Sequence, residues 1–366
     1  MRLPTWQESL DWLDNRLGWR AINEFGQHKQ VPLHWGGFWY YWGGICMFLF
    51  GLQVVTGIFL LLYYKPGSET AFESVQFITT KVNYGWLIRS IHSWASNLMI
   101  FAVFVHMFST FILKAYRAPR EFTWVTGSLL LFATLGFGFT GYLLPWNTLA
   151  YFATAVGTDI AGSVPVVGPT ILTLLRGGSE VSGATLTRFF GVHVVVLPMS
   201  LLGILGLHLY LIQKHGSSMP IPKHPGEPPV PTIPFWPDFA FRDAIGWLLA
   251  FGITCTLATI YPWEVGAKVD PLLPAPAGIH PEWYFGFMFQ ALKLIPSKVL
   301  FIEGELLGLM SFNIAGLLWV LTPFFDRKAS RGERSPGFTV LGIAIIVFIA
   351  GMTAWMYVQA AQQAAH

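Results

Sequence analysis

The sequence predicts an all-α membrane protein with about seven transmembrane helices, and three features indicate it. Apolar residues make up 54% of the 366 residues and charged residues only 11%, whereas a typical soluble protein carries roughly 25% charged residues. Seven apolar runs approach the length of about 20 residues that a helix needs to cross a bilayer. Two of these runs each contain a pair of histidines, and polar rings inside lipid are usually functional.

The overall charge and the cysteines exclude several other classes of protein. The formal net charge is only +3, so no nucleic-acid-binding surface is expected. Cys46 and Cys255 both lie inside apolar runs. Two such thiols provide neither a disulfide framework nor a C-x-x-C-H motif for covalent haem attachment, and they are too few for an iron–sulfur cluster.

The predicted spans follow one another from residue 38 to residue 358. They occupy residues 38–63, 88–113, 124–144, 186–212, 243–262, 300–322 and 336–358. The first 30 residues lack the continuous apolar core of a cleavable signal peptide, and we expect an amphipathic helix on the membrane surface there. Residues 145–185 alternate apolar and polar residues, as short surface helices do.

Basic residues in alternate connections predict the orientation, because such loops usually face the cytoplasm-like, negative side. They are Lys114, Arg117 and Arg120 after the second span, Lys214, Lys223 and Arg242 after the fourth, and Arg327, Lys328, Arg331 and Arg334 after the sixth. Seven spans then leave the C-terminus on the opposite, positive side.

A proline-rich segment divides the chain into two units. Residues 216–242 contain eight prolines between residues 220 and 237, a composition typical of an extended linker. We therefore predict a four-span unit at 1–215 and a three-span unit at 243–366.

Four histidines lie at matched intervals in the second and fourth spans. His92 and His106 are 14 residues apart, and His193 and His208 are 15 apart. At about 100° per residue, each pair returns to within about 40° to 60° of one helix face, and the rise between its members is about 21 Å. Because the two spans run in the same direction, His92 is level with His193 and His106 with His208. Two bis-histidine haems of b type, one near each side of the membrane, fit this pattern better than packing histidines or zinc, which needs four close ligands.

Glycines in the first and third spans repeat the same interval. Gly43 and Gly57 are 14 residues apart, as are Gly127 and Gly141. Glycine removes the side chain where a ring must approach a backbone, so we expect these positions to provide room for the haems. Small-residue helix packing is the alternative, but it favours spacings of four residues.

Several motifs resemble cytochrome b of the cytochrome bc and bf complexes, over nearly the whole chain. They are Gly85–His92 (GWLIRSIH), Pro119–Trp124 (PREFTW), Gly141–Trp146 (GYLLPW), Thr185–Phe190 (TLTRFF) and Pro281–Tyr284 (PEWY). The 15-residue histidine interval and the seven spans resemble the bf branch, with its four-span and three-span polypeptides fused into one chain. In that branch a cysteine before the first-span Gly-Gly holds a third, covalent haem, but Tyr41 stands at that position here. This departure argues against a third haem.

The resemblance also implies cations for the haem propionates. Family members carry an arginine three residues after the second ligand histidine, and Ser109 stands there in this chain. Arg120 or Lys114 is the expected substitute. Arg89 is the candidate at the other haem, although a snorkelling interfacial arginine is the alternative.

The resemblance implies a di-haem subunit of a quinol:cytochrome c, or plastocyanin-like acceptor, oxidoreductase that moves electrons and protons across the membrane in a Q cycle. Quinol oxidation at the positive side needs a proton-accepting carboxylate, for which we predict Glu282, with Tyr284 and Tyr142 shaping the pocket. For quinone reduction at the negative side we predict Asp243, Lys214 and His215, with helix capping and positive-inside charge as the alternatives.

The expected partners are a Rieske iron–sulfur protein, a c-type cytochrome subunit, quinol and quinone, in a dimeric complex of a bacterial inner membrane. A di-haem, quinone-reactive membrane anchor of a dehydrogenase or hydrogenase is the competing function, but it does not account for Pro281–Tyr284. The non-enzymatic alternative is a transporter or assembly protein, in which the histidines would only pack against neighbouring helices.

Overall fold

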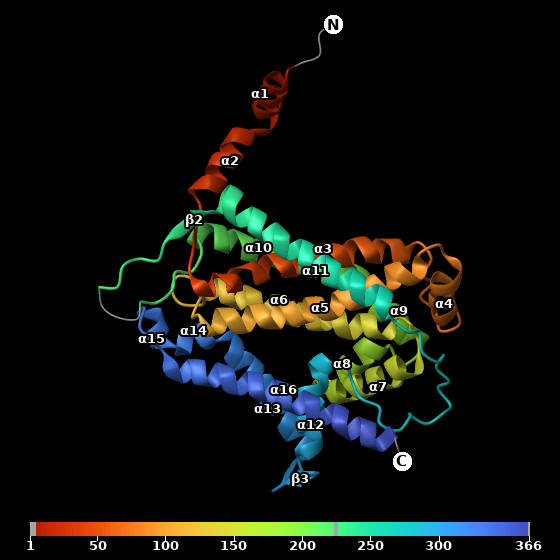
Figure 1. The fold of residues 1–366 in the computed structure, drawn as a ribbon. Helices are drawn as coiled ribbons and strands as arrows, with labels where there is room; N and C mark the ends of the chain where they lie inside the picture. The colour runs from red at the N-terminus through yellow and green to blue at the C-terminus, as the bar shows by residue number, and fades with distance from the viewer. Residues whose placement is uncertain (1–4, 223–225, 365–366) are drawn as a thin grey trace.

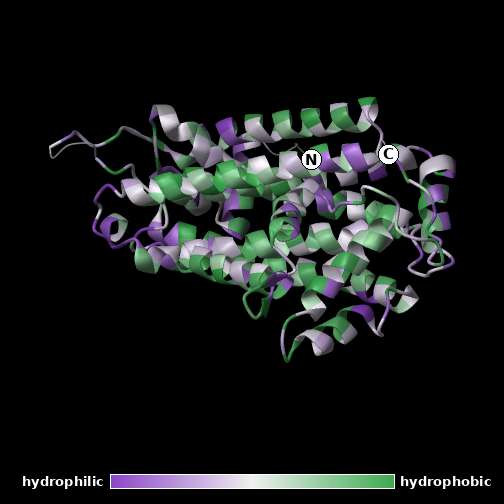
Figure 2. Cartoon of the chain, turned by 90° about the horizontal axis from the view of Figure 1, so that it is seen from below, coloured by the Kyte–Doolittle hydropathy of each residue, from purple (hydrophilic) through white to green (hydrophobic). Residues whose placement is uncertain are grey.

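The computed structural model describes residues 5–222 and 226–364, which form an almost entirely helical protein (Figure 1). Six of the helices in this part of the chain are long and apolar enough to cross a membrane: Gly36–Leu61, Gly85–Ile112, Glu121–Leu143, Gly183–His215, Phe235–Ile260 and Pro336–Gln363. They lie side by side, and hydrophilic residues gather toward their ends and in the connections (Figure 2). The predicted fold class is thus confirmed.

The remaining predicted span, 300–322, is shorter in the structure. Residues Lys298–Val299 (β3) and Ile302–Glu303 (β4) form a small antiparallel hairpin, so α13 covers only Gly304–Val320. Its 17 residues rise about 25 Å, slightly less than the hydrocarbon core of about 30 Å.

Four spans form the N-terminal bundle. They are α3 (Trp42–Leu61), α5 (Gly85–Ile112), α6 (Glu121–Leu143) and a continuous rod of α9 (Gly183–Gly191), η2 (Val192–Val196) and α10 (Leu197–His215). Helix α3 packs on α5, α5 on α6, and α6 on α10. The packing order in the bundle is therefore α3, α5, α6 and α10.

Short helices lie at the ends of the bundle, at the positions where surface helices are predicted. Residues 145–185 contain α7 (Thr148–Gly162) and α8 (Gly168–Arg176), and α4 (Ala71–Lys81) covers the same end in Figure 1. Among residues 5–30 there are two helices rather than one, α1 (Trp6–Leu17) and α2 (Trp19–His28), because Gly18 between them adopts φ +61°. Both project away from the bundle (Figure 1).

The helices of the C-terminal unit pack against the N-terminal bundle. It consists of η3 (Phe235–Phe239), α11 (Ala240–Ile260), α12 (Trp283–Leu294), α13, α14 (Thr322–Phe325), α15 (Arg327–Ser330) and α16 (Pro336–Ala364). Helix α11 packs on α3 and α5, α16 on α5, and α13 on α6. The fifth span begins at Phe235, ahead of the predicted start at Asp243.

In the residues that the structure describes, the proline-rich connection between α10 and η3 contains no helix. Its last residues, Thr232–Pro234 (β2), pair antiparallel with Gln30–Pro32 (β1) just before the first span. Side chains of α5 provide a second link between the two units. Ser90 Oγ donates to the Ala258 carbonyl (3.0 Å) and Trp94 Nε1 to that of Tyr261 (2.8 Å).

Candidate functional site

The four predicted histidines meet in two pairs inside the bundle. His92 and His106 belong to α5, His193 to η2 and His208 to α10. His92 lies near His193, and His106 near His208. We call the first pair the outer level and the second pair the inner level; their separation along α5 is about 21 Å.

Each imidazole approaches one of the four predicted glycines on the neighbouring helix. The pairs are His92 with Gly57, His193 with Gly141, His106 with Gly43, and His208 with Gly127. A Cβ at Gly141 would lie 2.6 Å from Cε1 of the histidine, and the corresponding distances at the other three glycines are 3.2–3.4 Å. The glycines therefore leave the space that the imidazole rings occupy. The prediction was that they leave space for the haems.

Three of the imidazoles are held by a threonine that sequence reasoning missed. Oγ1 of Thr56 lies 2.9 Å from Nδ1 of His92; for Thr126 and His208 the distance is 2.9 Å, and for Thr140 and His193 it is 3.1 Å. Each hydroxyl also lies 2.7–2.9 Å from the carbonyl oxygen four residues before it, in Leu52, Phe122 and Gly136 respectively.

The contacts of each hydroxyl favour the tautomer in which the imidazole carries its proton on Nδ1. A threonine hydroxyl has one hydrogen, and a carbonyl can only accept. The hydroxyl therefore donates to its own helix and accepts from Nδ1–H, which leaves Nε2 of each ring unprotonated and free to bind a metal. The signal in the sequence is the dipeptide Thr-Gly, at 56–57, 126–127 and 140–141.

His106 is the exception among the four. Its glycine is preceded by Trp42, and its buried Nδ1 has no hydrogen-bond partner in the described part of the chain. The inner level thus contains one restrained imidazole and one unrestrained imidazole.

A π-helical turn explains the 15-residue interval between His193 and His208. Leu197 N donates to the Val192 carbonyl five residues back, and Pro198 directly after it has no N–H to give. A π turn takes up one extra residue. The interval therefore covers about the same rotation as the 14 residues between His92 and His106, and both rods present their histidines on a single face.

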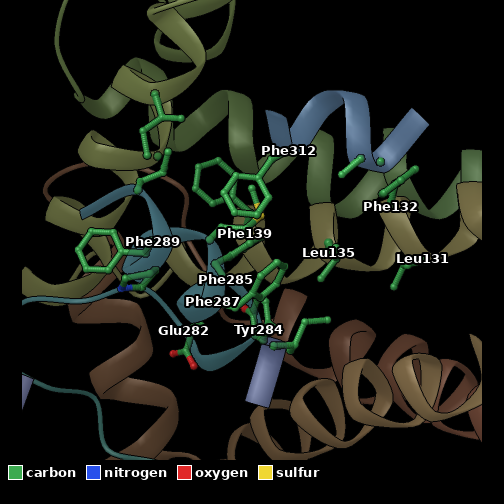
Figure 3. A pocket seen from close by; sticks show the side chains of 18 of the residues that line it. Leu131, Phe132, Leu135, Phe139, Glu282, Tyr284, Phe285, Phe287, Phe289 and Phe312 are labelled. Carbon is green, nitrogen blue, oxygen red and sulfur yellow. The ribbon is translucent and has the colours of Figure 1, made fainter. Parts of the chain in front are cut away.

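The three residues predicted for quinol oxidation line one cavity between the N-terminal bundle and the C-terminal unit. Glu282, Tyr284 and Tyr142 border a cavity of about 920 Å³ that runs between α6, α12, α13 and α16. Most of the other side chains around it are apolar or aromatic, such as Phe285 and Phe139 (Figure 3). This volume is typical of pockets for organic ligands.

Hydrogen bonds and close packing fix the segment that carries Glu282. Trp283 Nε1 donates to Asn97 Oδ1 of α5 (2.8 Å). Tyr284 is only 4% exposed, and its hydroxyl fits against Gly138, where a Cβ would lie 2.7 Å from Oη. Glu282 directly precedes the first residue of α12, so these neighbours determine its position.

Burial changes the acid–base properties of this segment. It raises the pKa of the Glu282 carboxyl to about 7. The pKa of Tyr284 also rises, because of burial first and the nearby Glu282 charge second. His280 lines the same cavity and packs against Tyr357 of α16, with the rings 4.9 Å apart. Sequence reasoning missed His280, although it lies only two residues before Glu282.

The three residues predicted for quinone reduction do not form one cluster. Asp243 is buried in α11 against Gly44 of α3, where a Cβ would overlap the carboxylate. Its Oδ1 has no partner among the described residues. Lys214 is exposed and His215 half-buried at the end of α10, and no contact joins either to Asp243 among the described residues. His34, a residue that was not predicted, also has a buried, unpartnered Nε2 near the start of α3.

The predicted propionate cations differ in what they bind. Arg89, 6% exposed, donates to the carbonyls of Trp263 (2.6 Å) and Glu264 (2.9 Å), so it is not a snorkelling surface arginine. Arg120 donates to the carbonyls of His215 (3.0 Å) and Ser217 (3.1 Å), at the end of α10.

Lys114 is the remaining candidate and has a different environment. It is 4% exposed, and its Nζ has no hydrogen-bond partner in the described chain. Nζ lies 5.0 Å from the centroid of the Phe111 ring. Burial lowers the pKa of this amine to about 8, although the nearby Asp326 charge acts in the opposite direction.

Two family models match consecutive parts of this chain. The family described as Cytochrome b/b6/petB matches residues 28–216, and the one described as Cytochrome b(C-terminal)/b6/petD matches residues 268–365. The chain belongs to the cytochrome b family. The two parts occur in one polypeptide, which confirms the predicted fused form, and this cytochrome b is a multi-pass membrane protein.

Known cytochromes b resemble this chain in sequence and structure. The cytochrome b subunit of a cytochrome bc complex from Chlorobaculum thiosulfatiphilum is 49% identical over 328 residues, 90% of this chain and 76% of that protein. The cytochrome b subunit of a menaquinol:cytochrome c reductase from Geobacillus thermodenitrificans is 42% identical over 218 residues, 58% of this chain and 97% of that protein. A solved chain of a hyperthermophilic respiratory Complex III matches with a TM-score of 0.78 and 26% identity, over 98% of this chain and 100% of that chain.

The donor atoms of this cytochrome b fit the haem that its family binds. No group of three or more His, Cys, Asp or Glu side chains suited to a bare metal ion occurs in the described residues. A haem iron needs only axial ligands from the protein, and each level offers two imidazoles.

The contact between Gly141 and His193 gives a test of this site. In a Gly141→Ala variant the new Cβ would displace the imidazole, which lies only 2.6 Å away. We expect the variant to bind less haem than the wild type, measured in the reduced-minus-oxidised spectrum. Gly203→Ala is the matched control in α10, because a Cβ there meets nothing within 4 Å. A Gly141→Ala protein with the full wild-type haem content would contradict the proposed packing.

Proposed function

We propose that this chain is the di-haem cytochrome b subunit of a quinol:cytochrome c oxidoreductase, working in a proton-translocating Q cycle. The observation that carries the proposal is the pair of levels, each with two imidazoles from α5 and the η2–α10 rod. His92 and His193 would hold one haem and His106 and His208 the other. When bound, the two haems supply one-electron transfer between the two sides of the membrane.

On the positive side, Glu282 is the proposed acceptor for a proton of the quinol. A general base works best when its pKa is near the operating pH, and burial raises the pKa of Glu282 to about 7. The apolar cavity beside it suits the ring and tail of a quinol. Tyr142 and Tyr284 would orient the ring, and the aromatic lining would exclude water from it.

On the negative side, Asp243 is the proposed proton donor for quinone reduction. Gly44 leaves room for its carboxylate, and an unpartnered buried Oδ1 suits a site that accepts a polar ligand. Lys214 and His215 stay predictions for the same site. His34, with its buried Nε2, is a further candidate at this end of α3.

Lys114 is the proposed partner of a haem propionate at the inner level. It lies just beyond the end of α5, the helix that carries His106. Its Nζ has no hydrogen-bond partner in the described chain, although the charge of Asp326 is nearby, so this buried ammonium can still gain stability from a directly bonded anion. Arg120 is engaged by the carbonyls at the end of α10, which favours Lys114 as the substitute for the arginine replaced by Ser109.

The proposed complex requires partners that supply the remaining redox centres. The two cysteines of this chain lie in different helices, α3 and α11, so a Rieske iron–sulfur protein and a c-type cytochrome or similar acceptor would belong to other subunits. Tyr41, at the position of the haem-binding cysteine of bf relatives, stacks on Phe239 with ring centroids 4.7 Å apart. This packing favours two haems and no third.

A haem count tests the proposed function directly. The pyridine haemochrome assay on the purified chain should give two b-type haems per polypeptide. A haem stain of the denatured chain should be negative, because no haem is covalently attached. The absence of b-type haem would overturn the function, and a stained chain would overturn the two-haem form.

A Glu282→Gln variant tests the proposed proton acceptor. We expect the rate of quinol oxidation to fall roughly 10²-fold. In the wild type the rate should rise with pH through about 7, because only the ionised carboxylate accepts a proton; the variant should lose this rise. His280, Tyr142, Tyr284 and Tyr357 also face this segment and remain unchanged. Glu303→Gln, at an exposed position in β4, is the control, and an unaltered pH profile in Glu282→Gln would rule out the role.

A Lys114→Met variant tests the proposed propionate partner. A nearby cation stabilises the electron on a reduced haem, so its loss should lower the midpoint potential of the inner-level haem and leave the outer level unchanged. Lys328→Met, at an exposed position in α15, is the control. Equal inner-level potentials in the two variants would exclude Lys114.

A further inference from the structure

The three Thr-Gly dipeptides have a common geometry that fits more than helix packing. We propose that Thr56, Thr126 and Thr140 are positioning residues that tune the haem ligands, two of them at the outer level and one at the inner level. The proposal rests on the haem ligation proposed above and deepens it.

Each threonine favours one direction of the hydrogen bond to its ring. Its own hydrogen points to the carbonyl four residues back, at 2.7–2.9 Å. Its oxygen is then an acceptor for Nδ1–H of the imidazole, and for His193 and His208 the carbonyls of Phe137 and Thr123 are further acceptors near the ring. Such a hydrogen bond fixes the ring orientation and makes the opposite nitrogen a stronger donor to iron.

A stronger donor stabilises the oxidised iron more than the reduced iron, because the oxidised iron has the higher positive charge. Each Thr–His bond should therefore lower the reduction potential of its own haem. The outer level has two such bonds, on His92 and His193, whereas the inner level has one, on His208. At His106 the Nδ1 is unpartnered in the described chain.

The chain also shows what a buried threonine does without this role. Thr134 lies in α6 between Thr126 and Thr140, is buried like them and donates to the Leu130 carbonyl at 2.8 Å. No imidazole contacts it in the described structure. Thr134 is also not followed by a glycine, because the next residue is Leu135. The Thr-Gly pair, rather than threonine in a membrane helix, is thus the feature linked to histidine.

The two levels differ at the residue before the glycine. At the inner level, Trp42 stands before Gly43, where a threonine precedes each of the other three glycines. Trp42 cannot donate or accept in the way that a threonine hydroxyl does, since its indole has only an N–H donor.

Redox titration of the purified, haem-loaded complex tests the proposal. Thr140→Val should raise the outer-level potential and Thr126→Val the inner-level potential, each without change at the other level. We expect roughly a tenfold change in the reduction equilibrium, which is about 59 mV for one electron. Thr140→Ser and Thr126→Ser retain a hydroxyl and should restore the wild-type values, and Thr134→Val should leave both unchanged.

The possible outcomes distinguish a failure of the tuning role from a failure of the proposed function. Valine variants that bind both haems with wild-type potentials would overturn the tuning role and leave the haem ligation intact. Shifts of equal size in Thr134→Val would also overturn it, because they would reflect general packing. A complex without b-type haem would overturn the proposed function instead. Resonance Raman spectra of the iron–imidazole mode give a second readout, since loss of the hydrogen bond should lower its frequency.

Discussion

Four imidazoles inside a membrane bundle require helices that approach them without a side chain in the way. At each of the four places the neighbouring helix presents a glycine, and at Gly141 even a methyl group would collide with the ring. This constraint determines which helices can be neighbours. It pairs the end of α3 with the start of α5, and the end of α6 with η2, so that adjacent helices run in opposite directions. The order of the helices in the bundle therefore follows from the four contacts between a glycine and an imidazole.

The sequence was sufficient for much of this arrangement, because its strongest signals were periodic. Apolar length predicted six spans that the structure has, and the repeated intervals predicted which histidines and glycines belong together. The boundaries were less predictable. Helix α12 is short and was missed, and α13 is shortened by the β3–β4 hairpin. Neither of these leaves a run of about 20 apolar residues.

Other features depend on contacts that no local pattern encodes. Arg89 looks like a propionate ligand by its spacing from His92, yet its donors go to carbonyls beyond α11, far along the chain. Lys114 became the better candidate only when its burial and lack of a partner were known. The π turn at His193 could have been suspected from Pro198 and the longer interval. The cavity beside Glu282 could not, because both units of the chain contribute to its walls.

The contacts between the two units have a consequence for how the protein is made. Strand β1 pairs with β2, α5 is bonded to the residues that end α11, and α13 and α16 lie against the bundle. Apart from the β1–β2 pairing, in which the connection itself takes part, these contacts join residues on either side of the peptide chain between α10 and η3. Its contribution is a high effective concentration of one unit near the other. A single translation product then delivers both units in equal numbers, so no N-terminal bundle is left in the membrane without the unit that completes the cavity beside Glu282.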